Sequence, residues 1–333
     1  MRITLKYDLR RADASPVSRE RLYAECLDQA AWADEAGFHG VAFLEHHGSD
    51  DGYCPAGTIL AGAVAARTRR LRIALRALVL PLHDPVRLAE ELAVIDLVSD
   101  GRLEIVAGLG YRPAEYEMLG VDFKRRAHLM EEGVEVLKRA WTGEPFEYRG
   151  RTIRVTPTPA QQPRPPIFLA GASDAAARRA ARIADGYDPI PAAAATFDTY
   201  AEECARLGRT PSERPRRVPA MTFLMIAEDP EKAWYVVRPF ALHEANSYGL
   251  WNAEAGQMSD YHPTPEAEAD KLRAQYRVIT PDQCVALARE LGPEGRIILH
   301  PLMSGLPPET AWESLHTFEK QVMPRLRDER LIT

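Results

Sequence analysis

The chain has 333 residues, of which 46 % are hydrophobic and 27 % are charged, an average composition for a globular protein with a large buried core. Its formal net charge is −6 and its basic residues are scattered, so we expect small-molecule partners and no nucleic acid. No run approaches the ~18 apolar residues of a membrane span, and the first residues lack the apolar core of a signal peptide. These features favour a cytoplasmic protein that does not enter a membrane.

Short β-rich runs alternate with helical stretches along the chain. The expected strands are 2–7, 40–45, 71–80, 103–108, 167–170, 187–190, 218–227 and 296–300. The run 187–190 is the weakest, because it is short and ends at Pro191, and a count of seven therefore stays open. Strict alternation of strand and helix predicts a parallel sheet, and eight such units close a (β/α)8 TIM barrel whose binding loops follow the strand C-termini.

Three of the expected helices have clear ends. They are Ser18 to Ala36 before Gly37, Asp84-Pro85 to Val98, and Thr280-Pro281 to Leu291 before Gly292. The four cysteines lie far apart in sequence and form no pair typical of a zinc site or a redox motif, so we expect free thiols.

Two stretches interrupt the alternation. The first, 156–166, contains five prolines, but the alternation resumes after it, and we therefore expect one domain over 1–333. The second, 243–277, precedes the last βα unit and is longer than usual for a connection. Its aromatic residues Tyr248, Trp251 and Tyr261 favour a lid insertion over the site. The alternative is packing on the outside of the barrel or in a dimer contact.

The run Glu45-His46-His47 stands at the end of the second expected strand. Ionisable residues there lie at the catalytic face of a barrel, where imidazole is suited to acid–base chemistry. The alternative is that the histidines only cap the strand in a hydrogen-bonded network. Because adjacent strand residues point to opposite faces, at most one histidine should point into the barrel mouth.

Small residues follow the fourth and fifth expected strands. Gly108 and Gly110, with Tyr111 and Arg112 after them, would let a flat ligand or a phosphate approach the backbone, although close packing of the barrel rim is an alternative. The expected cofactor residues after the fifth strand are Gly171, Ala172 and Ser173. They open a helix whose N-terminus would attract a phosphate, although Ser173 or Asp174 could instead be an ordinary cap.

Arg76 interrupts a long apolar run in the third expected strand. A charged group there needs a partner, so Arg76 either extends to solvent or meets an anion at the site.

These motifs, taken in order, resemble the bacterial luciferase-like flavin monooxygenases. The residues that carry the likeness are Glu45-His46-His47, Leu80-Pro81, Asp84-Pro85-Val86-Arg87, Ser99-Asp100-Gly101-Arg102, Gly108-Leu-Gly-Tyr111, Gly171-Ala-Ser173, Ala180-Ala181-Arg182-Ile183-Ala184-Asp185-Gly186 and Pro301-Leu302-Met303-Ser304-Gly305. The likeness covers nearly the whole chain. It implies a (β/α)8 barrel, often dimeric, with a reduced flavin across the strand C-termini and its phosphate near the fifth strand.

The same resemblance assigns roles to individual residues. It implies that His46 transfers protons, with His47 and Glu45 beside it, and that a non-proline cis peptide lies near Arg76-Ala77. The chain departs from luciferase at Leu109, where that protein has a phosphate-binding arginine, and Arg112 is the nearest replacement.

The resulting hypothesis is a monooxygenase that uses O2 and reduced FMN supplied by a separate reductase. A dehydrogenase or reductase that uses coenzyme F420 is the alternative, and a non-catalytic flavin-binding protein is a further one. A metal-dependent hydrolase is disfavoured because the first strand lacks the usual pair of ligands, so we expect no metal.

Overall fold

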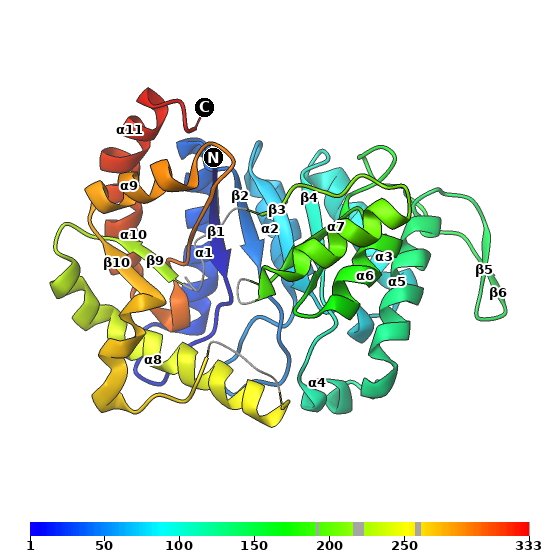
Figure 1. The fold of residues 1–333 in the computed structure, drawn as a ribbon, viewed down its shortest axis with the longest axis horizontal. Helices are drawn as coiled ribbons and strands as arrows, with labels where there is room; N and C mark the ends of the chain where they lie inside the picture. The colour runs from blue at the N-terminus through cyan, green and yellow to red at the C-terminus, as the bar shows by residue number, and fades with distance from the viewer. Residues whose placement is uncertain (191–192, 216–222, 257–260, 333) are drawn as a thin grey trace. The chain divides into compact units, whose positions relative to one another are not determined.

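The computed structural model describes residues 1–190, 193–215, 223–256 and 261–332 (Figure 1). The chain forms two compact units. Unit 1 consists of Met1–Ala42, Ser49–Cys54 and Pro215–Thr333, and unit 2 consists of Phe43–Gly48 and Pro55–Arg214.

Unit 1 contains the two ends of the chain. Its strands β1 (Arg2–Tyr7) and β11 (Arg296–Leu299) pair in parallel, with Arg2 opposite Arg296 and Leu5 opposite Leu299. Strands β9 (Phe223–Ile226) and β10 (Tyr276–Ile279) form a second parallel pair. The helices of unit 1 are α1 (Arg19–Ala36), α8 (Pro230–Glu254), α9 (Pro281–Leu291), α10 (Pro308–Thr317) and α11 (Met323–Asp328), with 3-10 segments at Glu266–Ala274 and Met303–Gly305 and a π segment at Phe318–Val322.

Unit 2 contains a parallel sheet in which the strands follow one another in the order β3, β4, β7, β8. These are β3 (Arg72–Leu78), β4 (Leu103–Ala107), β7 (Ile167–Gly171) and β8 (Gly186–Pro189), and β2 (Gly40–Phe43) leads into the unit. A hairpin of β5 (Phe146–Tyr148) and β6 (Arg151–Ile153) lies at one end. The helices are α2 (Gly57–Arg67), α3 (Pro85–Val98), α4 (Pro113–Met118), α5 (Arg126–Ala140), α6 (Asp174–Ile183) and α7 (Thr196–Arg206), with short 3-10 segments at Leu80–Leu82 and Phe123–Arg125.

All eight expected strands are present, including the weakest, which is β8. Their ends differ: the second strand stops at Phe43 and the third at Leu78, and the expected positions 218–222 lie outside the described residues. Strands β5, β6 and β10 are not expected from the sequence. β5 and β6 have only three residues, too few for a period of two to be visible, and β10 overlaps the stretch 243–277 that we expected to be a lid insertion.

The helix ends expected from local signals are confirmed. The Ser18 hydroxyl accepts a hydrogen bond from the Arg21 N–H, and Gly37 ends α1 with φ at 89°. The Asp84 carboxylate accepts from two N–H groups at the start of α3, and Thr280 forms a capping box with Gln283 at the start of α9.

The motif Ser99-Asp100-Gly101-Arg102 has a structural role in unit 2. The buried Arg102 guanidinium donates to the carbonyl oxygens of Ala65, Thr68, Leu71 and Ser99 and to the Thr68 hydroxyl. A buried charge is tolerated when its donors are satisfied, and Arg102 thereby ties the end of α2 to the start of β4.

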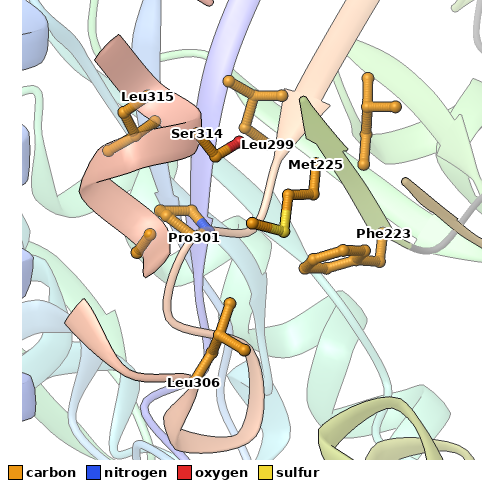
Figure 2. A pocket seen from close by; sticks show the side chains of 9 residues that line it. Phe223, Met225, Leu299, Pro301, Leu306, Ser314 and Leu315 are labelled. Atoms are coloured by element: carbon orange, nitrogen blue, oxygen red, sulfur yellow. The ribbon is translucent and has the colours of Figure 1, made fainter. Parts of the chain in front are cut away.

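An apolar core joins α8 to β9 and β10 in unit 1. Its largest members are Phe223, Trp234, Phe240 and Tyr276. A small pocket beside it lies between β9, β11 and α10 (Figure 2), and the Ser314 hydroxyl there accepts the Ile226 N–H at 2.8 Å. The pocket lining has no ionisable side chain, so we interpret it as a packing feature.

None of the helices formed by the described residues has the length and the apolar character needed to cross a bilayer. All four cysteines are buried free thiols, as expected: Cys26, Cys54, Cys204 and Cys284.

Candidate active site

Glu45 is the centre of a hydrogen-bonded cluster in unit 2. Its Oε1 atom accepts from His47 Nε2 and from His83 Nε2, each at 2.8 Å, and its Oε2 atom accepts from the Val79 N–H at 3.0 Å. Val79 and His83 follow β3, so this carboxylate ties the loop after β2 to the loop after β3. The cluster fixes the backbone on both sides of His46.

The cluster also shifts the pKa of its members. Burial alone would raise the pKa of Glu45, but the hydrogen bonds and charges of His47 and His83 outweigh burial and lower it to about 2. Burial alone would lower the pKa of His83, but the hydrogen bond and charge of Glu45 outweigh burial and raise it. Glu45 is therefore a carboxylate at neutral pH.

His46 is paired with a different carboxylate. Its Nδ1 atom lies 2.7 Å from Oε1 of Glu115, a residue of α4 whose side chain is 1 % exposed. The same oxygen accepts the His47 N–H at 3.0 Å and Nη1 of Arg112 at 3.2 Å. Burial alone would raise the pKa of Glu115, but these hydrogen bonds and charges outweigh it and lower the pKa.

The hydrogen bond to Glu115 assigns the tautomer of His46. A carboxylate only accepts, so Nδ1 carries the hydrogen, and Nε2 is the acceptor nitrogen of the neutral ring. About one tenth of the His46 side chain is exposed. The Tyr111 ring lies edge-on to the imidazole, and the two ring centroids are 5.5 Å apart. The arrangement can accept or release a proton at Nε2 while Glu115 holds the ring and stabilises the imidazolium.

The side chains of the two adjacent histidines form hydrogen bonds with different carboxylates: His46 pairs with Glu115, and His47 pairs with Glu45. The expectation that at most one of them points into the barrel mouth stays a prediction. The strand itself ends at Phe43, so the divergence arises in the loop after β2 and not in a regular strand.

Arg76 in β3 meets carboxylates of the protein itself. Its guanidinium contacts Asp188 of β8, and Nη1 lies 3.7 Å from Glu104 of β4. The sequence left open whether Arg76 extends to solvent or meets an anion. In the structure the anions near Arg76 are the carboxylates of Asp188 and Glu104. The peptide bond between Arg76 and Ala77 is cis, as the resemblance implied.

Close packing is enough to require glycine at two of the expected cofactor positions. A Cβ atom on Gly108 would lie 2.9 Å from Cβ of Ala77, and one on Gly171 would lie 2.4 Å from Cβ of Ala176. Both approaches are shorter than real Cβ contacts. The packing alternative therefore accounts for these two glycines, and an approach of cofactor to Gly108, Gly110 or Gly171 stays a prediction.

Gly171, Ala172 and Ser173 form the junction between β7 and α6. The Ser173 hydroxyl caps α6 by accepting the Ala176 N–H at 3.3 Å, and Oδ1 of Asp174 accepts the Thr199 hydroxyl at 2.8 Å. The hydrogen bond to Thr199 draws the Asp174 carboxylate toward α7. An ordinary cap is therefore present, and the expected phosphate would bind backbone N–H groups of the same helix end.

Arg112 belongs to the histidine cluster. Its Nη1 atom donates to Glu115 and, at 3.2 Å, to the carbonyl oxygen of His47. Nη1 of Arg112 therefore binds the loop after β2. The expected role of Arg112 at the cofactor phosphate stays a prediction.

Three residues of the site were not proposed from the sequence: His83, Glu115 and Asp188. His83 and Glu115 follow the third and fourth strands, where polar residues face the catalytic side of a barrel, and this position was the available signal. Asp188 is inside a short strand, and nothing local connects it to Arg76.

A family model described as luciferase-like monooxygenase matches residues 7–292. The chain belongs to the luciferase-like monooxygenase family. Its expected fold, the luciferase-like (β/α)8 barrel, is confirmed by solved structures that match along nearly the whole chain.

Among the curated relatives of this luciferase-like chain is the oxygenase component of a flavin-dependent trigonelline monooxygenase from Acinetobacter baylyi. It is 30 % identical over 160 residues, which cover 46 % of this chain and 44 % of the relative. The chain spans about half the length of the curated relatives it matches.

Three solved structures are similar to the whole luciferase-like chain. Monooxygenase RslO1 from Streptomyces bottropensis is 26 % identical, with a TM-score of 0.77 over 98 % of this chain and 99 % of that one. The oxygenating constituent of 3,6-diketocamphane monooxygenase from Pseudomonas putida, in complex with FMN, is 20 % identical, with a TM-score of 0.74 over 98 % of both chains. An F420-dependent secondary alcohol dehydrogenase is 18 % identical, with a TM-score of 0.70 over 98 % and 99 %.

Proposed function

We propose that this chain is a flavin-dependent monooxygenase that uses reduced FMN and O2 to oxidise a small organic substrate. The observation that carries the proposal is the pairing of His46 with the buried Glu115 at the end of a barrel strand. Reduced FMN would supply the electrons that activate O2, and the protein would supply the proton transfers and the binding surface.

His46 is the proposed catalytic acid or base. Its Nε2 atom would hold or deliver the proton, because Nδ1 is engaged by Glu115. Glu45 and His47 are the remaining members of the proposed catalytic group. The bond from His47 to Glu45 fixes the residue next to His46, and both side chains are largely buried, which restricts water around the imidazole.

The junction of β7 and α6 fits a cofactor phosphate. Gly171, Ala172 and Ser173 have small side chains, and α6 begins with backbone N–H groups that can donate to an anion. The acidic side chain of Asp174 also lies at this end of α6, where its carboxylate accepts a hydrogen bond from the Thr199 hydroxyl of α7. Ala77, Gly108, Gly110 and Tyr111 would then lie along the cofactor, with Arg76 and Arg112 as the nearby cations.

The monooxygenase is preferred over an F420-dependent dehydrogenase. Relatives with 30 % and 26 % identity are named monooxygenases, whereas the F420-dependent structure is 18 % identical. Because one relative is named an oxygenase component, we also propose that a separate flavin reductase supplies the reduced cofactor.

An anaerobic titration distinguishes the two cofactors and the enzyme from a flavin-binding protein. The purified chain is titrated with reduced FMN and, separately, with reduced coenzyme F420, and air is then admitted while the absorption spectrum is followed. We expect saturable binding of reduced FMN and a rapid reaction with O2. Tight binding of F420 with no reaction in air would contradict the monooxygenase, and binding without turnover on any substrate would indicate a carrier.

We also propose a homodimer formed through α2 and α3. These two helices expose the large apolar side chains of Ile59, Val94, Leu97 and Val98. Exposed apolar side chains that are grouped often mark a protein–protein interface. Sedimentation equilibrium of the wild type and of Val94→Glu tests this: the wild type should be a dimer and the variant a monomer. A monomeric wild type would contradict the proposal.

A further inference from the structure

A second group of ionisable side chains lies in unit 1, at the C-terminal ends of two paired strands. Asp8 follows β1, His300 follows β11, and Glu244 belongs to α8. Each offers one ligand atom, and the three ligand atoms lie within 4.8 Å of one another. All three side chains are about 1 % exposed.

The polar atoms of this group are poorly satisfied by the protein. Among the residues that the structure describes, Oε2 of Glu244 and both ring nitrogens of His300 are buried without a hydrogen-bond partner. They lie near opposite charge only at longer range: His300 Nδ1 is 3.6 Å from Glu244 Oε2, and His300 Nε2 is 3.4 Å from Asp8 Oδ1. Buried polar atoms normally have partners, so these atoms indicate a further bound species.

The charges around the group favour a cation. Asp8, Asp51 and Glu244 contribute three carboxylates, and Arg10 contributes one guanidinium, whose Nε atom lies 3.5 Å from both Asp8 and Asp51. With neutral imidazoles the sum is three negative charges and one positive charge, a net of −2, which one divalent cation would neutralise. His243 lies 3.1 Å from Asp51 and is the other imidazole facing the group.

We propose that Asp8, Glu244 and His300 bind a first-row divalent transition-metal ion, represented experimentally by Zn²⁺ or Co²⁺. The donor set of one imidazole and two carboxylates suits these ions, whereas Mg²⁺ and Ca²⁺ prefer oxygen ligands alone. Ligand atoms about 2.1 Å from a tetrahedral metal are roughly 3.4 Å apart, and the three ligand atoms of this group lie within 4.8 Å of one another before any metal is bound.

The surroundings contain the outer contacts that such a site needs. The Tyr276 hydroxyl donates to Oε1 of Glu244 at 3.3 Å, which leaves Oε2 facing His300. The metal would join α8 to the ends of β1 and β11 and thereby stabilise unit 1.

Metal binding is measured on tag-free protein stripped with a chelator. We expect about one equivalent of Zn²⁺ per chain by equilibrium dialysis, a visible tetrahedral spectrum with Co²⁺, and a higher Tm when metal is present. Glu244→Gln keeps the shape of the side chain and should weaken binding at least roughly tenfold to a hundredfold. Asp8→Asn should do the same.

Two control variants make the assignment specific. Among the residues that the structure describes, Glu45, His47 and His83 form a second group that could bind a metal, and His83→Ala disrupts it. His316→Ala removes a half-exposed histidine of unit 1. Both should retain one equivalent of Zn²⁺. Binding that survives Glu244→Gln but is lost in His83→Ala would overturn the proposal.

The wild type alone also decides the question if the variants of the buried residues do not fold. A stripped wild type that gives no Co²⁺ spectrum and no change of Tm with Zn²⁺ would overturn the proposal. His300 and the two carboxylates would then be a buried polar group that needs no metal.

Discussion

Nδ1 of His46 and Oε1 of Glu115 lie 2.7 Å apart, although 69 residues separate them in the chain. One residue follows β2 and the other is in the helix after β4, so the parallel order of the strands brings them together. Glu115 cannot reach solvent and has its hydrogen bonds to His46, the His47 N–H and Arg112. Because it touches the proposed catalytic histidine and not the reacting atoms, it is a positioning residue.

Replacement of His46 by alanine should retain flavin binding and lower turnover by about 10²–10⁴-fold, because that is the usual contribution of general acid–base catalysis. Stopped-flow turnover and flavin titration measure the two effects separately. His128→Ala is the matched control, because this exposed histidine of α5 lies outside the cluster. Unchanged turnover in His46→Ala would remove His46 from the mechanism.

Glu115→Gln should lower kcat by roughly tenfold to a hundredfold, less than the loss of His46 itself, and leave KM nearly unchanged. The amide has no negative charge to stabilise the imidazolium, so the pH midpoint of the rate profile should move down. Glu115→Asp restores the charge and should return part of the rate and the original midpoint. A loss of kcat without any movement of the profile would indicate a structural role only.

The stability of the chain should fall in acid because of Glu45. Its pKa is about 2 in the fold, below its ordinary value of 4.5, so its contribution is complete above about pH 5 and disappears as the pH falls toward 2. The raised pKa of His83 acts oppositely: its contribution is complete below the ordinary pKa of 6.5 and is lost as the pH rises through the higher folded value.

Urea unfolding at pH 7 and at pH 3 measures the contribution of Glu45. Wild type should lose more stability between these values than Glu45→Gln, by on the order of 1–3 kcal/mol. Glu144→Gln, an exposed acid of the same unit, is the control. Equal pH dependence in wild type and Glu45→Gln would show that the hydrogen bonds to His47 and His83 do not favour the ionised form.

The proposed phosphate site predicts that FMN binds more tightly than riboflavin. If Arg112 helps to bind the phosphate, Arg112→Ala should reduce the ratio of the two affinities about tenfold, because charge-assisted hydrogen bonds are strong. If Arg112 only holds Glu115 and the loop after β2, turnover should fall while the ratio stays constant. Arg125→Ala, which removes an exposed arginine of the same unit, should change neither. Equal binding of FMN and riboflavin by wild type would contradict the whole site.

The stretch 243–277 remains a proposed lid. In the structure its first part is the end of α8, where the Tyr248 hydroxyl lies 2.8 Å from that of Tyr53, and 257–260 lie outside the described residues. Closure over a reactive cofactor would exclude water, so proteolysis between Gly249 and Thr264 should slow when cofactor and substrate are added. Complete protection in both states would contradict a lid.

Local signals in the sequence were sufficient for much of the fold. The helix ends at Gly37, Asp84 and Thr280 depend on one turn of chain each, and hydrophobic runs of the barrel strands are visible without a partner. Strand ends could not be predicted as well, because β2 stops at Phe43, where no glycine or proline marks an end in the sequence. The histidine motif also marked the candidate site, since its place after a strand is a property of sequence order.

What only the tertiary structure decided is which charged groups meet. The partners of His46, Glu45 and Arg76 are distant in sequence, because each comes from the end of another strand or the helix after it. The same holds for Asp8, Glu244 and His300, which come from the first and the last segments of unit 1. The sequence determines which functional group each side chain has. The pKa of that group and the ligands it can bind depend on distances of a few ångströms, and these distances are set only when the strands and helices pack.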